Sequence, residues 1–434
     1  MKSDRTAKDE RCIIPCNSLE GELEVPGDKS ISHRGLILGA LADGESRVSN
    51  LAPGNDVQST LDCLEQLGVR ISREECLIQI MGEGLGGLSQ PQTSLQAGNS
   101  GTLMRLLSGV LAGHSFQICI KGDESLNQRP MERIAIPLRK MGARIRTRNG
   151  NPPLEILGGE LRGIEYSPEV ASAQVKSCVI LAGLHADGVT KIIEPGPSRD
   201  HTEVILRAVD YPLEVKENVI SLRGEGKVEP FALKVPGDFS SAAFFITAGL
   251  LAEDSEILLK DVGLNDTRTG FLELARRMGG EIVTENLRSE LGEPKADLLV
   301  RSSSLKGITI RGTEVVKAID ELPLVAILGS QAEGATVIKD AEELRVKETD
   351  RIQATVHNLR ALGVEVEGHP DGLSLEGPCN LSGARLRSFS DHRIAMAFSV
   401  AGLFAKGKSY VENSSCVKVS YPDFFRDLEE LKNA

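Results

Sequence analysis

Basic side chains in this sequence gather where helices are expected to begin. Lys29 and Arg34 stand at one such start, and Arg351 and Arg393 stand at two others. Helix N-termini expose unpaired amide groups and the positive end of the helix dipole, so they attract anions and disfavour Arg and Lys. A chain of net charge −12 that places its bases there is expected to hold a small, highly charged anion.

The same pattern extends over six helix starts and over the starts of the helices that follow them. The polar and charged residues at these positions are Lys29, Ser30, Arg34, Asn99, Ser100, Gly101, Thr102, Arg105, Arg129, Ser172, Gln174, Lys176, Arg199, Ser240, Ser241, Asp320, Lys347, Glu348, Arg351, Asp391, His392 and Arg393. Two carboxylates among them, Asp320 and Glu348, are suited to proton transfer beside cations. By contrast, Ser240, Ser241, Asp56 and Asp266 are expected to be ordinary helix caps.

The elements that carry these residues form one repeated unit, which consists of an apolar helix, a short β-rich segment and an amphipathic helix. Apolar copies begin near residues 29, 99, 173, 238, 320 and 391, and amphipathic copies span 56–67, 130–141, 201–209, 267–278, 348–362 and 422–431. A helix that is apolar all round is expected to be buried, whereas the amphipathic helix has one wet face. Four amphipathic copies lead into Gly68, Gly142, Gly279 and Gly363, which fit glycine helix stops. The pattern predicts a layered α/β fold.

A duplicated hexapeptide divides the six units into two sets of three. LEVPGD at 23–28 recurs as LKVPGD at 233–238. Self-similarity at a fixed period indicates a repeat architecture. We therefore expect two similar domains, one formed by 25–236 and the other by 1–24 plus 237–434.

Composition and charge exclude several classes of protein. The longest apolar windows, 242–252 and 394–405, are well short of the roughly 20 residues that a membrane helix needs. Residues 1–12 are charged and do not resemble a signal sequence, so a cytoplasmic location is expected. Among eight cysteines the only close pair is Cys12 and Cys16, which favours reduced thiols and no metal. The acidic charge and 3% aromatic content argue against nucleic acid as a partner.

Seven longer segments occur in order across nearly the whole chain: LEVPGDKSISHRGLILGALADG, LQAGNSGTLMRLLSG, NQRPMERI, SAQVKSCVILAGL, SRDHTE, RVKETDRI and SDHRIAMAFSVAGL. Together they resemble the family of the 5-enolpyruvylshikimate-3-phosphate synthases. The resemblance implies an inside-out α/β barrel of six repeats, three per domain, in two domains that close over the substrates. The domain with 237–434 would also hold the N-terminal segment, because the chain would cross between the domains twice.

The implied reaction moves the enolpyruvyl group of phosphoenolpyruvate to the 5-hydroxyl of shikimate 3-phosphate and releases phosphate. This is a step of the shikimate pathway toward chorismate and aromatic amino acids. The resemblance implies no cofactor, small-molecule substrates as the partners, a monomer, and competition by glyphosate for the phosphoenolpyruvate site.

The resemblance also assigns roles to residues. Contacts to shikimate 3-phosphate would come from Lys29, Ser30, Arg34, Ser172, Ala173, Gln174, Ser198, Arg199, Asp320 and Lys347. Contacts to phosphoenolpyruvate would come from Lys29, Asn99, Gly101, Arg129, Gln174, Arg351 and Arg393. The catalytic residues would be Asp320, which orients or deprotonates the 5-hydroxyl, with Glu348 and Lys29 exchanging protons with the enolpyruvyl unit.

The chain departs from the family pattern at three places. Ala173 replaces the second serine of a Ser-Ser-Gln pattern, and Arg199 is the expected replacement contact. Glu343 stands where some members have Asn, and a carboxylate cannot donate to a phosphate. Val419 aligns with a C-terminal lysine of the family while Lys418 is shifted by one, so that role is not assigned.

Two other functions stay open at this stage. A UDP-N-acetylglucosamine enolpyruvyl transferase would have a similar fold, but it carries a reactive Cys shortly before an Arg-Pro step. Residues 122–128, which precede Arg129 and Pro130, contain no Cys, and Cys119 belongs to an apolar strand. A non-enzymatic two-domain anion-binding protein would also fit the charge and the duplication, but it would not need Glu348 beside the cations.

Overall fold

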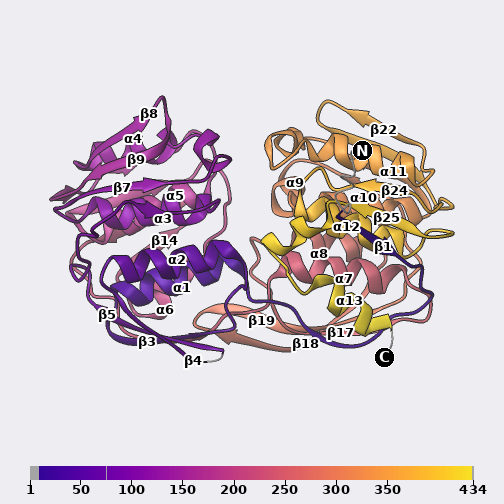
Figure 1. Cartoon of the computed structure of the whole chain (residues 1–434), viewed down its shortest axis with the longest axis horizontal. Coiled ribbons are helices and arrows are strands. Elements are labelled where there is room, and N and C mark those ends of the chain that lie inside the picture. The colour runs from indigo at the N-terminus through magenta and orange to yellow at the C-terminus, as the bar shows by residue number, and fades with distance from the viewer. Residues whose placement is uncertain (1–8, 75, 433–434) are drawn as a thin grey trace, which may run out of the picture. The chain divides into compact units, whose positions relative to one another are not determined.

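The computed structural model describes residues 9–74 and 76–432, which fall into two compact units of mixed α/β structure (Figure 1). Unit 1 comprises Met1–Pro26, Gly237–Arg288 and Pro294–Ala434, and unit 2 comprises Gly27–Pro236 and Ser289–Glu293. Residues 1–8, part of the first expected segment, lie outside the described residues. Each unit has its own apolar core.

Unit 2 contains three four-stranded sheets and one small pair of strands. In their order across the first sheet, the strands are β16 (Ala232–Lys234), β3 (Asp43–Ser49), β5 (Leu77–Glu83) and β4 (Arg70–Glu74). The second sheet consists of β6 (Leu95–Gln96), β7 (Gln117–Lys121), β9 (Asn151–Leu157) and β8 (Arg144–Arg148). The third consists of β11 (Glu165–Tyr166), β13 (Val189–Ile193), β15 (Val219–Arg223) and β14 (Leu213–Lys216). The pair is β10 (Leu161–Arg162) with β12 (Ala186–Asp187).

Unit 1 repeats this arrangement. Its sheets are β18 (Glu281–Glu290), β19 (Glu293–Arg301), β17 (Glu256–Gly263) and β2 (Glu20–Glu24); β20 (Thr309–Ile310), β21 (Gly334–Ile338), β23 (Gly372–Gly377) and β22 (Val366–His369); and β1 (Glu10–Ile13), β25 (Ser409–Glu412) and β24 (Arg385–Arg387). The N-terminal strands β1 and β2 therefore belong to unit 1.

All six sheets share one pairing pattern. A central strand pairs in parallel with one neighbour and antiparallel with the other, as β7 does with β6 and β9. The duplicated hexapeptide explains how the units are linked: β2 pairs with β17 in unit 1 before the chain enters unit 2, and β16 pairs with β3 in unit 2 before the chain returns.

The six apolar helices are buried along most of their length, as predicted. They are α1 (Lys29–Leu41), α3 (Gly101–Ala112) and α5 (Ala173–Gly183) in unit 2, and α7 (Phe239–Leu251), α10 (Leu322–Gln331) and α12 (His392–Gly402) in unit 1. Each begins within two residues of its predicted start. Within each unit these helices pack on one another, as α3 does on α5 and α12 does on α7.

The amphipathic helices begin within three residues of the predicted positions. They are α2 (Asn55–Gln66), α4 (Glu132–Met141), α6 (His201–Ala208), α8 (Gly270–Arg277), α11 (Arg351–Ala361) and α13 (Phe424–Lys432). Gly68, Gly142, Gly279 and Gly363 all have positive φ angles, between 90° and 116°. The glycine stops are thus confirmed, because this backbone region disfavours other residues.

The remaining helical elements are short. They are α9 (Thr313–Ala318) and the 3-10 turns η1 (Leu126–Gln128), η2 (Glu342–Val346) and η3 (Ser414–Val419). Lys418 lies within η3.

The chain leaves unit 1 once more than the sequence predicts. The connection between β18 and β19, Ser289–Glu293, belongs to unit 2, although both strands pair in unit 1. Its Leu291 packs against the apolar core of unit 2, and its fully buried Glu293 accepts a hydrogen bond from His201 Nδ1 at 2.8 Å. The expected boundaries are corrected accordingly: the chain crosses at 26/27 rather than 24/25, and 289–293 changes unit.

Two expectations about chain class can be compared with the structure. All eight cysteines are free thiols. No helix among residues 9–74 and 76–432 combines the length and the apolar character that a membrane crossing requires.

Candidate active site

Each unit brings a separate group of the predicted residues together. In unit 1 we define the Asp320 cluster as the side chains of Arg268, Asp320, Lys347, Glu348, Arg351 and Arg393. Arg268 precedes α8, Asp320 lies between α9 and α10, and Arg393 is in the first turn of α12.

Four cations face the carboxylate of Asp320. Arg351 donates from Nη1 to its Oδ1 at 3.2 Å, and Lys347 Nζ lies 3.9 Å from the same oxygen. Arg393 Nη2 and Arg268 Nη1 lie 3.8 and 3.9 Å from Oδ2. Asp320 precedes the N-terminus of α10 by two residues and does not cap it, because Glu321 occupies the cap position.

Arg351 is the most buried member of the cluster, with a side chain 1% exposed. It donates to Asp391 at 2.8 Å and to Glu348 at 2.6 Å as well as to Asp320. Burial alone would lower the pKa of Arg351, but the three carboxylates outweigh burial and raise it. Arg351 is therefore a permanent cation that fixes three carboxylates.

Glu348 is ionised far below neutral pH. Burial opposes its ionisation, but the charges of Arg351, His392 and Arg393 prevail and lower its pKa to about 2. Its side chain is 41% exposed, so a ligand can reach it. At neutral pH Glu348 is therefore a carboxylate.

A buried chain of hydrogen bonds extends from Arg393 to Arg268. Arg393 donates to Glu321 at 3.1 Å, Ser240 donates to the same Glu321 oxygen at 2.5 Å, and Arg268 donates to the Ser240 hydroxyl at 2.5 Å. Glu321 is 1% exposed and Arg268 is 5% exposed. The chain ties the starts of α7, α8, α10 and α12 together.

The sequence patterns singled out neither Arg268 nor Glu321 as site residues. The sequence pattern predicts site residues at the starts of amphipathic helices, such as Arg129, Arg199 and Lys347. The same reasoning applied to the copy at 267–278 would have selected Arg268. Glu321 offers no such signal, because an acidic residue at a helix start is an ordinary cap.

In unit 2 a second group surrounds the start of α3. Asn99 accepts a hydrogen bond from Arg129 at 2.7 Å, and Gln174 accepts one from Arg105 at 2.6 Å. Gly101 lies between the two cations: a β-carbon placed on it would lie 2.7 Å from Arg105 Nη1 and 3.5 Å from Arg129 Nη1. We call these five residues the Gly101 cluster.

Positive charge in the Gly101 cluster is not compensated by carboxylates. In the described part of the chain Arg105 and Arg129 donate only to neutral oxygens, those of Gly101, Pro130, Gln174 and Asn99. Burial lowers the pKa of Arg105 to about 10, and repulsion from Arg129 and Arg133 adds to that effect. An anion bound here would be stabilised by both guanidinium groups.

The start of α1 supplies Lys29 and Arg34. Lys29 Nζ pairs with Asp56 of α2 at 3.1 Å. Arg34 is buried, and it donates to the hydroxyls of Thr202 and Ser177 at 2.7 and 2.8 Å and to the carbonyl oxygen of Ser30 at 2.9 Å. Burial lowers the pKa of Arg34, while the nearby Glu203 charge opposes that change.

The start of α5 lies beside the 194–200 segment. Ser172 caps α5, because its hydroxyl accepts from the amide of Val175 at 3.4 Å, and Ala173 is the first residue of the helix. Ser198 donates to Glu194 at 2.5 Å. Arg199 is partly buried and close enough to Arg34 to repel its charge.

Four expected caps were wrong. Asp238, rather than Ser240 or Ser241, caps α7 with its side chain. The cap position of α2 is Gly54, and Asp56 pairs with Lys29 instead. The cap position of α8 is Thr269 rather than Asp266. In each case the residue preceding the helix was misplaced by two or three positions.

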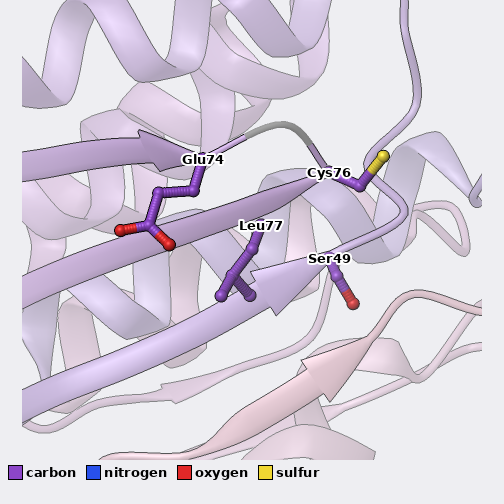
Figure 2. A pocket seen from close by; sticks show the side chains of 4 residues that line it. All are labelled: Ser49, Glu74, Cys76 and Leu77. Carbon is purple, nitrogen blue, oxygen red and sulfur yellow. The ribbon is translucent and has the colours of Figure 1, made fainter.

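One surface hollow is lined by residues of neither cluster. It has a volume of about 530 Å³ and is lined by Ser49, Glu74, Cys76 and Leu77 at the end of the β4–β5 hairpin (Figure 2). It holds one carboxylate and no cation, so it is not suited to an anion. The chemistry therefore lies at the helix starts rather than in this hollow.

The comparisons with known proteins agree with this arrangement. Residues 13–428 match the family model of EPSP synthase (3-phosphoshikimate 1-carboxyvinyltransferase). A 3-phosphoshikimate 1-carboxyvinyltransferase from Geobacillus kaustophilus is 49% identical over 96% of this chain and 99% of its own length. Another from Bacillus thuringiensis is 45% identical over 97% of this chain and 99% of its own length.

Solved structures give the same result. An EPSP synthase from Acinetobacter baumannii matches with a TM-score of 0.92 and 43% identity over 97% of this chain and 98% of that chain. The enolpyruvyl transferase NikO from Streptomyces tendae shares the fold at a TM-score of 0.80 with 18% identity, over 98% of both chains. The family match, the near-complete coverage and the residues at the helix starts lead to one conclusion: this chain belongs to the EPSP synthase family.

Proposed function

We propose that this chain catalyses transfer of the enolpyruvyl group of phosphoenolpyruvate to the 5-hydroxyl of shikimate 3-phosphate, with release of phosphate. The observation that carries the proposal is the Gly101 cluster, where the acceptors of Arg105 and Arg129 among residues 9–74 and 76–432 are all neutral. Such uncompensated guanidinium groups suit the carboxylate and phosphate of phosphoenolpyruvate. Four residues of this cluster, Asn99, Gly101, Arg129 and Gln174, are among those that the family resemblance assigns to that substrate.

The reaction has two stages. In the addition, the 5-oxygen bonds to C2 of phosphoenolpyruvate, the hydroxyl loses its proton and C3 gains one. In the elimination, the C2–phosphate oxygen bond breaks, C3 loses a proton, the double bond forms again and phosphate leaves. The protein must therefore supply a base for the hydroxyl, an acid for C3 and later a base for C3.

We assign these roles by protonation state. Asp320, a carboxylate among four cations, orients and deprotonates the hydroxyl. Glu348 is a carboxylate at neutral pH, and its role in this proposal is to take the proton that leaves C3 in the elimination. Lys29 is the remaining acid, and it delivers the proton to C3 in the addition.

The substrate contacts that the family resemblance assigns are part of this proposal. Shikimate 3-phosphate would meet Ser30, Arg34, Ser172, Ala173, Gln174, Ser198, Arg199 and Lys347, and phosphoenolpyruvate would also meet Arg351 and Arg393. We further propose a cytoplasmic monomer that binds no nucleic acid.

The UDP-N-acetylglucosamine enolpyruvyl transferase reaction is disfavoured by the thiols. Cys119, the cysteine nearest in sequence before Arg129, lies in β7, and burial raises its pKa. A reactive cysteine requires a lowered pKa and an exposed position.

A coupled assay of phosphate release tests the proposal. Phosphoenolpyruvate would be supplied with shikimate 3-phosphate, with UDP-N-acetylglucosamine or with no acceptor. We expect release only with shikimate 3-phosphate. Release with the nucleotide sugar, or no release with either acceptor, would overturn the proposal.

Two variants locate the phosphoenolpyruvate site in the same assay. Arg129→Met should raise the Michaelis constant for phosphoenolpyruvate at least about tenfold, since one charge-assisted contact contributes roughly 1.5 to 3 kcal/mol. Arg148→Met is the matched control, because Arg148 is exposed on β8. Equal Michaelis constants in the two variants would remove Arg129 from the site.

A further inference from the structure

One lysine near the proposed substrate site has an ammonium group that is almost fully buried. The Lys176 side chain, in the first turn of α5, is 1% exposed. Its Nζ lies 2.8 Å from Glu194 Oε2 and 2.7 Å from Glu203 Oε1. An isolated buried charge is very costly, so these contacts account for the position of the ammonium group.

The same ammonium group reaches the segment that carries Ser198. Lys176 Nζ donates to the carbonyl oxygen of Ser198 at 3.4 Å, and the Ser198 hydroxyl donates to Glu194 at 2.5 Å. Glu194 therefore accepts from Lys176 with one oxygen and from Ser198 with the other. Both the backbone and the side chain of Ser198 are held by this group.

Three elements meet at Lys176. The lysine is on α5, Glu194 follows β13, and Glu203 is in the first turn of α6. The 194–200 segment connects β13 to α6 and contains Pro195, Gly196 and Pro197, which form no regular structure. Glu194 is held by its amide, which donates to the carbonyl oxygen of Asn218 at 2.9 Å, whereas Ser198 is held through the side chains of Lys176 and Glu194.

Lys176 itself is poorly placed to hold a substrate anion. Its ammonium group already faces two carboxylates, so the group as a whole offers an anion no excess positive charge. The sequence pattern grouped Lys176 with the bases that hold the anion, and the structure corrects that grouping. Ser198 and Arg199, on the segment that Lys176 holds, are the residues proposed to meet the substrate.

We propose that Lys176 is a positioning residue: by holding Glu194 and Ser198 it fixes the 194–200 segment for the phosphate group of shikimate 3-phosphate. This inference rests on the proposed function. It predicts that Lys176 determines how strongly the protein prefers shikimate 3-phosphate to shikimate, because only the phosphorylated ligand uses the segment.

The test variant must keep the net charge of the buried group Lys176, Glu194 and Glu203 unchanged. Lys176→Met alone would leave Glu194 and Glu203 buried without their cation, which commonly costs several kcal/mol. The test therefore uses Lys176→Met in the background of Glu203→Gln, which removes one charge of each sign. Glu203→Gln alone is the reference, and Lys191→Met, on the exposed face of β13, is the matched lysine control.

The measurement is the dissociation constant of shikimate 3-phosphate and of shikimate by titration calorimetry, without phosphoenolpyruvate. Relative to Glu203→Gln, we expect the double variant to bind shikimate 3-phosphate about tenfold or more weakly, a loss of about 1.4 kcal/mol. Shikimate binding should change less than about twofold. Lys191→Met should keep the wild-type preference.

Several outcomes would overturn the inference. One is a folded double variant that prefers shikimate 3-phosphate to shikimate as strongly as Glu203→Gln does. Another is an equal rise in the dissociation constants of both ligands, which indicates a general structural role. If the double variant does not fold, Lys176→Arg decides, because the longer planar guanidinium cannot meet the same three acceptors in the same geometry. A wild-type preference in Lys176→Arg would then refute positioning by Lys176.

The wild-type protein separates this inference from the proposed function. If it neither prefers shikimate 3-phosphate nor releases phosphate with it, the proposed function fails and the inference fails with it. If the wild-type protein does both, a negative result with the variants refutes only the role of Lys176.

Discussion

Cations in the two clusters differ in what neutralises them. Around Asp320, the four cations Arg268, Lys347, Arg351 and Arg393 are set among five carboxylates, Asp238, Asp320, Glu321, Glu348 and Asp391. Around Gly101, the acceptors of Arg105 and Arg129 that the described residues supply are amide and carbonyl oxygens alone. The first cluster is therefore suited to proton transfer and orientation, and the second to binding an anion.

Replacement of Asp320 by Asn tests the proposed base. Asn keeps the shape and removes the charge that four cations face, so we expect turnover to fall by roughly 100-fold or more, the usual contribution of a general base. Binding of shikimate 3-phosphate should be largely retained. Asp254→Asn, at an exposed loop position with φ of 48°, is the control, because Asn tolerates that backbone region. Near-normal turnover of Asp320→Asn would exclude Asp320 as the base.

Replacement of Gly101 by Ala tests the anion site. The added methyl would press on Arg105 Nη1 at 2.7 Å and lie 3.5 Å from Arg129 Nη1. Both are flexible side-chain ends, so the fold should survive while the guanidinium groups shift. Overpacking costs about 1 to 3 kcal/mol, roughly 5- to 150-fold in affinity. We expect glyphosate, the longer ligand, to lose more affinity than phosphoenolpyruvate.

The measured quantity is the ratio of the glyphosate inhibition constant to the Michaelis constant for phosphoenolpyruvate. It should rise in Gly101→Ala and stay at the wild-type value in Gly86→Ala, since a β-carbon on Gly86 meets nothing within 4 Å. An unchanged ratio in Gly101→Ala would place Gly101 outside the phosphoenolpyruvate site.

At the scale of elements, α1 is anchored by a buried histidine between its two cationic residues. His33 is fully buried; its Nδ1 lies 2.7 Å from the Thr60 hydroxyl of α2, and its Nε2 lies 3.4 Å from the Ser100 hydroxyl that caps α3. Its pKa is lowered to about 3, mainly by burial; the charges of Lys29 and Arg34 act in the same direction, and those of Asp56 and Asp28 oppose the change. His33 is thus neutral in the folded protein.

This histidine makes stability depend on pH. Between the unfolded pKa of about 6.5 and the folded pKa of about 3, only the unfolded chain takes up the proton, so stability falls as pH falls below about 6.5. The loss is about 1.4 kcal/mol per pH unit, or about 2 kcal/mol at pH 5. Burial also lowers the pKa of His185 to about 3, so the wild-type protein carries a second, parallel contribution.

Urea unfolding at several pH values isolates the contribution of His33. His33→Gln should reduce the slope of the unfolding free energy between pH 7 and 5 relative to the wild-type protein. His357→Gln, at an exposed position on α11, should leave the slope unchanged. The same slope in His33→Gln and wild type would show that His33 does not titrate in this way.

At the scale of the whole molecule, the exposed apolar side chains suggest no self-association. In the described residues the large exposed ones are Ile14, Ile136, Val170, Val215, Val283, Leu287, Val316, Val346 and Val419, which belong to many different elements. A stable interface usually covers about 800 Å² on each partner and has a contiguous apolar centre. One or two exposed apolar side chains on an element do not supply such a centre.

We therefore expect a monomer. Light scattering coupled to size-exclusion chromatography should give a mass near 46.7 kDa that is constant from low to high micromolar concentration. A mass near twice that value, or one that rises with concentration, would contradict the monomer.

Sequence by itself determined the repeated unit, the burial of its apolar helix and, to within a few residues, where most of the helices begin and end. These features are local: the apolar periodicity recurs within one helix, and glycine stops such as Gly142 depend on the backbone of a few residues. The motifs also identified the family, because they contain the residues at the helix starts and occur in the family's order along the chain. Helix starts could be located to within three residues, which was too coarse to name the caps of α2, α7 and α8.

Only the tertiary structure decided which partners those residues have. The partner of Lys29 is 27 residues away, that of Arg393 is 72 away, and His201 meets Glu293 across 92 residues. No local pattern encodes such distances, so Lys176 resembled an anion-binding lysine until Glu194 and Glu203 were found around it. The placement of 289–293 in unit 2 has the same reason, because burial of Leu291 and Glu293 depends on a core formed by other parts of the chain.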